Sequence, residues 1–187
     1  VARISAEAKA KRGFRERVIA PGQKNPLDAL PDLGAERLAS MDANGVSVQV
    51  ISQSAAGADL VDGPEGVALA REFNDTLADA CKKNPTRFAG FAHLPLRSPE
   101  ECAKELERCV TKHGFVGALV NGTCEDKFLD DPRYDSLLSA MEKLDVPLYI
   151  HPSLPPQSVF KTYYDGLPGS AGVAISTARS EEHTSEL

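Results

Sequence analysis

The sequence lacks several patterns that would assign it at once to a known class of protein. No apolar run approaches the roughly 20 residues that a membrane helix needs, so we expect no membrane partner. Lysine and arginine total 21 against 27 aspartates and glutamates, a net charge of −6, which argues against a nucleic-acid partner. Neither GxGxxG nor GxxxxGK[ST] occurs, so the sequence contains no dinucleotide or nucleoside triphosphate motif.

The four cysteines, Cys81, Cys102, Cys109 and Cys124, form no CxxC pair. Cys102 and Cys109 fall on one predicted helix, where their spacing corresponds to about 10 Å of rise, too far for a disulfide. We therefore interpret all four as free, buried thiols of a protein in a reducing compartment. This interpretation predicts a cytoplasmic location.

Both ends of the chain differ from its middle. The N-terminal stretch VARISAEAKAKRGFRERV has no apolar core of the kind that a secretory signal contains, and we assign residues 1–34 to an irregular segment. The C-terminal string RSEEHTSEL corresponds to one reading frame of a common sequencing adaptor. We assign residues 179–187 to such an artefact and exclude its His183 from the candidate ligands, which leaves residues 35–178 as the predicted domain.

Between residues 35 and 151, amphipathic helical patterns alternate with short apolar strands. The predicted helices are AERLASMDANG, a segment from Pro64 to KKNP, SPEECAKELERCVTKHG and DPRYDSLLSAMEKLD. The predicted strands are VSVQVIS, RFAGFAHLP, FVGALVN and VPLYIH. Such alternation predicts an α/β protein with a parallel sheet. It leaves two architectures open, a doubly wound sheet and part of a (β/α)8 barrel, which normally has about 250 residues.

Local signals define how these helices begin and which residues they bury. The helix from Pro64 is expected to bury one stripe, Val67, Ala70, Phe73, Leu77 and Cys81. In the next helix Ser98 and Glu101 are expected to form a capping box, and in the last one Asp131 is the expected cap. His113 precedes Gly114 at a helix end, where a cation interacts well with the helix dipole, and we assign it no catalytic role.

Polar residues stand where the four apolar strands end, at Ser52, His93, Asn121 and His151. In both architectures, ligands bind at the carboxyl ends of the strands. A neutral imidazole at His151 could bind a metal or transfer protons, or it could simply end the strand. Structural roles are open for the others as well: a loop residue at Ser52, a hydrogen-bonded core histidine at His93, and an Asx turn toward Gly122 at Asn121.

Four segments in this order carry a family resemblance: ERLASMDANGVSVQVIS, ALAREFNDTLADACKKNPTRFAGFAHLP, KHGFVGALVNGT and LDVPLYIHP. They resemble the amidohydrolase-related, metal-dependent barrels, and within these the subgroup of aminocarboxymuconate-semialdehyde and dihydroxybenzoate decarboxylases. The resemblance implies an α/β fold that is part of a (β/α)8 TIM barrel. It would comprise about strands 2 to 5 with their helices and be truncated at both ends.

The resemblance also implies a divalent metal, zinc first and manganese as the other candidate, with His151 as a metal ligand. It implies a substrate-binding position for Asn121, and we add His93 and Ser52 as substrate-binding candidates. Relatives usually place a small or hydroxyl residue where this chain has His93. The family's catalytic aspartate has no counterpart in this sequence, so the catalytic residue is unknown.

For the parent protein, the resemblance implies a metal-dependent, non-oxidative decarboxylase of a hydroxylated aromatic or related carboxylic acid, which is a carbon–carbon lyase. The alternative is a metal-dependent hydrolase of a lactone, amide or similar carbonyl substrate on the same barrel. A barrel kept for binding alone is a third possibility. We expect a small aromatic carboxylate as partner, a homo-oligomer at full length, and no activity from this segment by itself.

Overall fold

The computed structural model describes residues 26–53, 57–151, 153, 155–167 and 171. The segment assigned to a sequencing adaptor, 179–187, lies outside these residues, as does most of the segment 1–34. The described part of segment 1–34 contains the 3-10 turn η1 (Pro26–Ala29). Arg37 in helix α2 (Ala35–Ala43) anchors the residues that follow η1, because its guanidinium donates to the carbonyl oxygens of Leu30 and Asp32.

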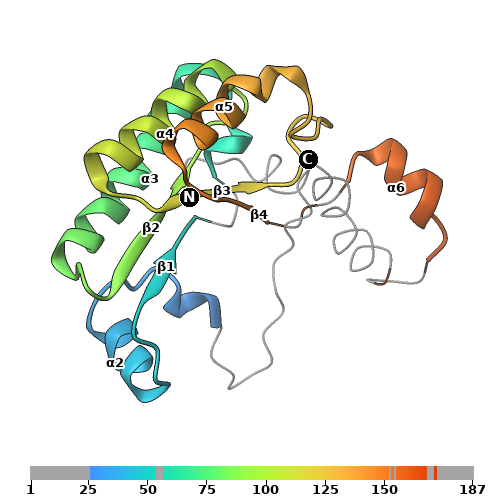
Figure 1. The fold of residues 1–187 in the computed structure, drawn as a ribbon. Coiled ribbons are helices and arrows are strands. Elements are labelled where there is room, and N and C mark those ends of the chain that lie inside the picture. The colour runs from blue at the N-terminus through green and yellow to red at the C-terminus, as the bar shows by residue number, and fades with distance from the viewer. Residues whose placement is uncertain (1–25, 54–56, 152, 154, 168–170, 172–187) are drawn as a thin grey trace.

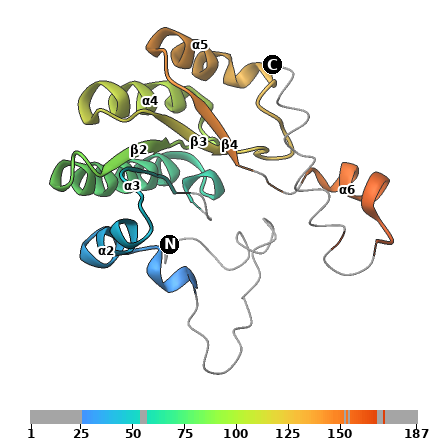
Figure 2. The ribbon, with the colours of Figure 1, turned by 60° about the horizontal axis from the view of Figure 1, so that its bottom comes forward.

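Four parallel strands form one sheet in sequential order. They are β1 (Gln49–Ile51), β2 (Phe88–His93), β3 (Gly117–Asn121) and β4 (Leu148–His151). The helices between them, α3 (Gly63–Lys83), α4 (Pro99–His113) and α5 (Asp135–Leu144), all lie on the convex face of the curved sheet (Figures 1 and 2). A doubly wound sheet would instead carry helices on both faces and a non-sequential strand order. The structure is therefore a partial (β/α)8 barrel, as the resemblance implies.

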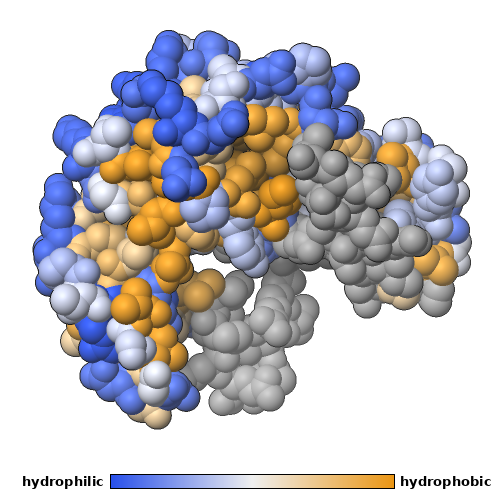
Figure 3. Space-filling model, in the orientation of Figure 1, coloured by the Kyte–Doolittle hydropathy of each residue, from blue (hydrophilic) through white to orange (hydrophobic). Residues whose placement is uncertain are grey.

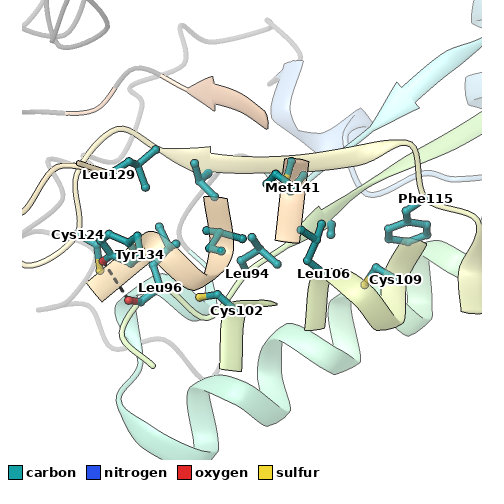
Figure 4. Close-up of a cluster of buried hydrophobic side chains, with 14 of the residues drawn as sticks. Leu94, Leu96, Cys102, Leu106, Cys109, Phe115, Cys124, Leu129, Tyr134 and Met141 are labelled. Atoms are coloured by element: carbon teal, nitrogen blue, oxygen red, sulfur yellow. Dashed lines mark hydrogen bonds between the residues drawn. The ribbon is translucent and has the colours of Figure 1, made fainter. Parts of the chain in front are cut away.

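The core lies between the convex face of the sheet and the helices. Leu94, Leu106 and Met141 point into this layer from three different parts of the chain (Figure 4). Alternate strand residues such as Ala92, Ala118 and Val120 complete it. A strand sends successive side chains to opposite faces, so the neighbours of these residues project from the concave face.

The concave face is largely open among the described residues. Val50 and Tyr149 are 49% and 52% exposed, and Phe91 contacts Tyr149 across β3 with ring centroids 6.3 Å apart. Figure 3 shows apolar surface over the strand layer beside hydrophilic surface over the helices. None of the helices in the described part of the chain is long and apolar enough to cross a membrane.

Two details of the predicted helices are wrong. In α3 the buried residues include Leu69, Asn74 and Ala78, whereas Val67 and Phe73 are only half-buried. The buried stripe is displaced because Asn74 hydrogen-bonds to β2, which a search for apolar periodicity does not detect. The other predicted stripe members, Ala70 and Leu77, are buried and Cys81 is half-buried.

The expected capping box of α4 is also absent, since the side chain of Ser98 makes no cap hydrogen bond. Glu101 instead pairs with Lys104 at 2.6 Å. The cap at Asp131 is confirmed, because its carboxylate accepts the Arg133 amide at 3.1 Å. It caps a 3-10 turn, η3 (Pro132–Tyr134), that precedes α5.

Two more elements, η2 (Ala58–Leu60) and α6 (Gln157–Tyr164), lie in segments for which we predicted neither helix nor strand. Strand β1 is shorter than predicted. Only Gln49–Ile51 pairs with β2, although the apolar run begins at Val46. The prediction of free cysteines is confirmed. Three of the four are buried, and Cys81 is half-buried.

Helices α4 and α5 end at residues with the same left-handed backbone, Gly114 with φ 70° and Asp145 with φ 52°. Glycine adopts this conformation without steric cost, whereas a residue with a Cβ atom is strained. We expect Asp145→Gly to raise the free energy of unfolding by about 0.5–1 kcal/mol, and Gly114→Ala to lower it by a similar amount. Urea unfolding of the two variants in the full-length protein measures both, and equal stabilities would contradict the argument.

Candidate active site at the carboxyl ends of the strands

The structure brings three of the four predicted site residues to one end of the concave face. His151 ends β4 and pairs in register with Asn121, which ends β3. His93 ends β2 and pairs with Leu119, which is two residues before Asn121 in β3. Ser52 lies elsewhere: it follows β1, whose last residue Ile51 pairs with Gly90, well before the end of β2.

Ser52 is half-buried and lines a cavity of about 320 Å³ together with Gln53, Phe73 and His93. One strand, β2, therefore lies between Ser52 and Asn121, and two strands lie between Ser52 and His151. The structure does not bring Ser52 together with that pair, because β1 is the edge strand and ends early.

His93 is 4% exposed, and its ring and backbone polar groups are hydrogen-bonded. Its Nε2 accepts the amide of Ala58 at 2.8 Å, and its own amide and carbonyl bond to the Asn74 side chain at 2.8 and 2.9 Å. Burial lowers the pKa of His93, while the Asp59 carboxylate and the Gln53 backbone act in the opposite direction. These contacts match a neutral, hydrogen-bonded core histidine, which was the structural alternative for His93, and they hold the loop at Ala58.

The neutral state of His93 predicts a pH dependence of stability. A histidine whose pKa is depressed by folding contributes stability that is present above its unfolded pKa and lost as the pH falls through the folded pKa. We expect the full-length protein to lose about 1 kcal/mol between pH 7 and 5.5 through this group, since the unfolded pKa is about 6.5. Urea unfolding at both pH values measures the loss. His93→Gln, which cannot titrate, should show a smaller difference, and an equal difference would contradict the assignment.

Sequence reasoning missed Asp59, which lies in turn η2 and is 2% exposed. Its Oδ2 accepts the side-chain amide of Asn121 at 2.8 Å, and its carbonyl lies 3.8 Å from the Cys124 sulfur. The only signal was an acidic residue within a loop of small and apolar residues, QSAAGADLVDG. Its partner is 62 residues further along the chain, so no local pattern reveals the contact.

Beyond Asn121 the pairing of β3 with β4 continues for one more residue. The amide of Gly122 donates to the carbonyl oxygen of His151 at 3.1 Å, which continues the β3–β4 pairing by one step. Just beyond, the hydroxyls of Thr123 and Ser153 are 3.2 Å apart. The backbone bond from Gly122 to His151 and the hydroxyl contact between Thr123 and Ser153 therefore link the ends of β3 and β4.

Charged side chains link the loops that surround this end of the sheet. Arg97, which follows β2, contacts Asp62 and Glu125, and Arg133 also contacts Glu125, at 3.0 Å. Glu125 and Asp126 both have positive φ, 53° and 59°, in a tight turn that non-glycine residues rarely form. Two arginines thus hold the loop that carries Glu125.

His151 is half-buried on the concave face and has the right donor chemistry for zinc or manganese. The described residues contain no group of three His, Cys, Asp or Glu side chains that could hold a metal ion. They therefore offer one ligand of a metal site and do not complete it, because a catalytic zinc generally needs three protein ligands.

Gly57 is required by the close approach of its loop to His93. A Cβ atom on Gly57 would lie 2.3 Å from His93 Nε2, where the Ala58 amide now bonds. We expect Gly57→Ala to lower the free energy of unfolding by about 2 kcal/mol, measured by urea titration of the full-length protein. Gly34→Ala is the control, because its Cβ would meet only the Asp32 carboxylate, at 3.3 Å, and should change stability far less. Similar losses of stability in the two variants would contradict the explanation that Gly57 is required by the close approach to His93.

A curved parallel sheet with polar side chains at its carboxyl ends defines the class as a (β/α)8-barrel enzyme scaffold. The family model for amidohydrolases matches residues 14–185, and the chain belongs to this family. It is 41% identical over 151 residues to a γ-resorcylate decarboxylase of Rhizobium sp. strain MTP-10005, covering 76% of this chain and 46% of the relative. It is 31% identical to a 2-amino-3-carboxymuconate-6-semialdehyde decarboxylase of Dictyostelium discoideum, covering 62% and 33%.

Two solved structures similar to this chain are also structures of decarboxylases. A 5-carboxyvanillate decarboxylase of Novosphingobium aromaticivorans, complexed with manganese and 4-hydroxy-3-methoxy-5-nitrobenzoic acid, has a TM-score of 0.76 and 34% identity. That similarity covers 87% of this chain and 48% of the other. A 2,6-dihydroxybenzoate decarboxylase complexed with 2,6-dihydroxybenzoate has a TM-score of 0.72 and 36% identity, covering 87% and 54%. The chain thus spans about half the length of the relatives it matches.

Proposed function

We propose that the full-length protein carrying this chain is a metal-dependent, non-oxidative decarboxylase of a hydroxylated aromatic carboxylic acid. One observation supports this most directly: His151 and Asn121 end adjacent strands on the concave face of a barrel whose relatives include γ-resorcylate decarboxylases. Parallel barrels carry their chemistry at this end of the strands.

In this proposal His151 is a metal ligand and Asn121 contacts the substrate. Manganese is the first candidate, because manganese is bound in the similar 5-carboxyvanillate decarboxylase, and zinc is the second. When bound, the metal acts as a Lewis acid toward the substrate's oxygen atoms. The remaining ligands and the proton donor come from outside the described residues, so we assign neither to this chain.

The reaction itself needs no oxidant. The bond between the ring carbon and the carboxylate breaks, its electron pair stays with the ring carbon, and that carbon takes a proton while carbon dioxide leaves. The part of the protein described by the structure contributes binding and orientation: Asn121 can hydrogen-bond a ring hydroxyl, and His93 and Asp59 hold the surrounding loop.

The test is an assay of the full-length protein after metal removal and reconstitution with manganese or zinc. Carbon dioxide release from 2,6-dihydroxybenzoate that depends on added metal supports the proposal. Hydrolysis of an aromatic lactone without carbon dioxide release would favour the hydrolase instead. Binding of dihydroxybenzoate without turnover would favour a barrel retained for binding.

We also propose a cytoplasmic location and a homo-oligomer for the full-length protein. The location is supported by four cysteines that remain free although three are buried. Size-exclusion chromatography with light scattering tests the oligomer.

A further inference from the structure

Residues 57–62, between β1 and α3, cross the sheet at the carboxyl ends of β2 and β3, and we call them the loop. It bonds to β2 through the Ala58 amide and His93 Nε2, and to β3 through Asp59 Oδ2 and the Asn121 amide, both at 2.8 Å. Gly57 allows this close approach, since a Cβ atom there would overlap the His93 ring. The loop thus reaches Asn121 from the β2 side, whereas His151 lies on the β4 side.

The contact with Asp59 determines the orientation of the Asn121 side-chain amide, that is, whether its nitrogen or its oxygen faces Asp59. An ionised carboxylate only accepts hydrogen bonds, so it must face the NH2 group of the amide and not its oxygen. The oxygen of the same amide is then turned away from Asp59. Without this partner the amide could rotate, and it could offer a donor or an acceptor in the same place.

Burying a carboxylate in order to hold a loop costs more free energy than burying a neutral polar side chain. Asp59 is 2% exposed, and moving a charge out of water costs free energy that a neutral residue would not require. A serine or asparagine at this position could bond to Asn121 as well. A carboxylate differs from them in that it accepts only, and therefore permits one orientation of the amide.

We propose that Asp59 is a positioning residue that turns the Asn121 side-chain oxygen toward the His151 side of the site, where it accepts a hydrogen bond from the substrate's ring hydroxyl. The proposal rests on the function proposed above and deepens it, because it assigns the recognition of the hydroxyl group. A site built to accept from a hydroxyl discriminates strongly against an analogue that lacks it, since the acceptor is then left unpaired.

The experiment compares four forms of the full-length, metal-loaded protein: wild type, Asp59→Asn, Asn121→Ala and the double variant. Asp59→Asn keeps the size of the side chain but lets the Asn121 amide stand either way round. Calorimetry gives the dissociation constants for 2,6-dihydroxybenzoate and for benzoate, which lacks the hydroxyls. Metal content and thermal midpoint are measured for each form.

We expect Asp59→Asn to weaken dihydroxybenzoate binding about tenfold and to leave benzoate binding and metal content unchanged, which corresponds to one lost hydrogen bond. Because Asp59 acts through Asn121, the double variant should bind no more weakly than Asn121→Ala alone. The control is Asp62→Asn, three residues away on an exposed carboxylate that pairs with Arg97, and it should change neither affinity.

The two proposals fail in different ways. Wild-type protein that releases carbon dioxide, with an Asp59→Asn variant that still prefers dihydroxybenzoate by the wild-type factor, overturns the role of Asp59 alone. Equal weakening for both ligands, or additive losses in the double variant, also overturns it, because a merely structural role would give those results. Wild-type protein that binds neither acid and releases no carbon dioxide overturns the proposed function together with this inference.

Discussion

Replacing His151 with glutamine in the full-length protein is expected to remove the bound metal and to lower the rate of carbon dioxide release roughly 1,000-fold or more. Glutamine is close in size and stays polar, but its amide is a far weaker ligand than a neutral imidazole. His151 ends β4, beside Asn121 in the adjacent strand, so the substitution leaves the strand pairing through its backbone unchanged. Metal content by mass spectrometry and activity should fall together.

The matched control is His113→Gln, which makes the same change at another described histidine. His113 ends α4 in the helix layer and lies 3.1 Å from Asp75, remote from the carboxyl end of β4. This variant should keep its metal and its activity, with at most a lower thermal midpoint. A His151→Gln protein with a full complement of metal would contradict the assignment of His151 as a ligand, and so would equal metal loss in the two variants.

Glu105→Gln is expected to lower the free energy of unfolding by about 3 kcal/mol, because it breaks a buried ion pair from one side. Glu105 is 1% exposed, and its carboxylate accepts two bonds from Arg108, at 2.7 and 2.9 Å, and one from Asn74 at 2.7 Å. Burial raises the pKa of Glu105, but the hydrogen bonds from Arg108 and Asn74 outweigh it and hold that pKa below its usual value. The neutral amide would deprive the guanidinium of its buried counter-charge and leave it only the exposed Asp75 carboxylate, 2.6 Å away.

Urea unfolding of the full-length protein at pH 7 measures this loss. The control is Glu101→Gln, one helical turn earlier in α4, where a partly exposed carboxylate pairs with Lys104 at 2.6 Å. Surface ion pairs contribute about 0–1 kcal/mol, so this variant should remain close to wild type. Equal losses in the two variants would show that burial of Glu105 does not set the energy of its ion pair.

Glu105→Gln should also weaken substrate binding at the candidate active site. Asn74 bridges Glu105 to the backbone of His93, and the His93 ring in turn holds the loop at Ala58. One chain of hydrogen bonds therefore connects the helix layer to the loop that carries Asp59. Variants along it are expected to weaken substrate binding as well as stability.

Much of this molecule could be predicted from the sequence, because the information is local. Helix and strand periods follow from which residues are apolar, and the parallel sheet follows from their alternation. The polar groups at the strand ends were visible for the same reason: His93, Asn121 and His151 each interrupt an apolar run. The resemblance then implied a barrel rather than an open sheet, which the sequential strand order confirms.

What only the tertiary structure decided depends on contacts between distant residues. Asn74 is buried in α3 because its amide bonds to His93, 19 residues away, and Asp59 is buried because it meets Asn121, 62 residues away. Neither residue differs locally from a solvent-exposed polar side chain, so no periodicity or motif marks it. The separation of Ser52 from Asn121 and His151 is of the same kind, since it follows from strand register. The sequence determined which side chains stand at the strand ends, and the fold decided which of them face one another.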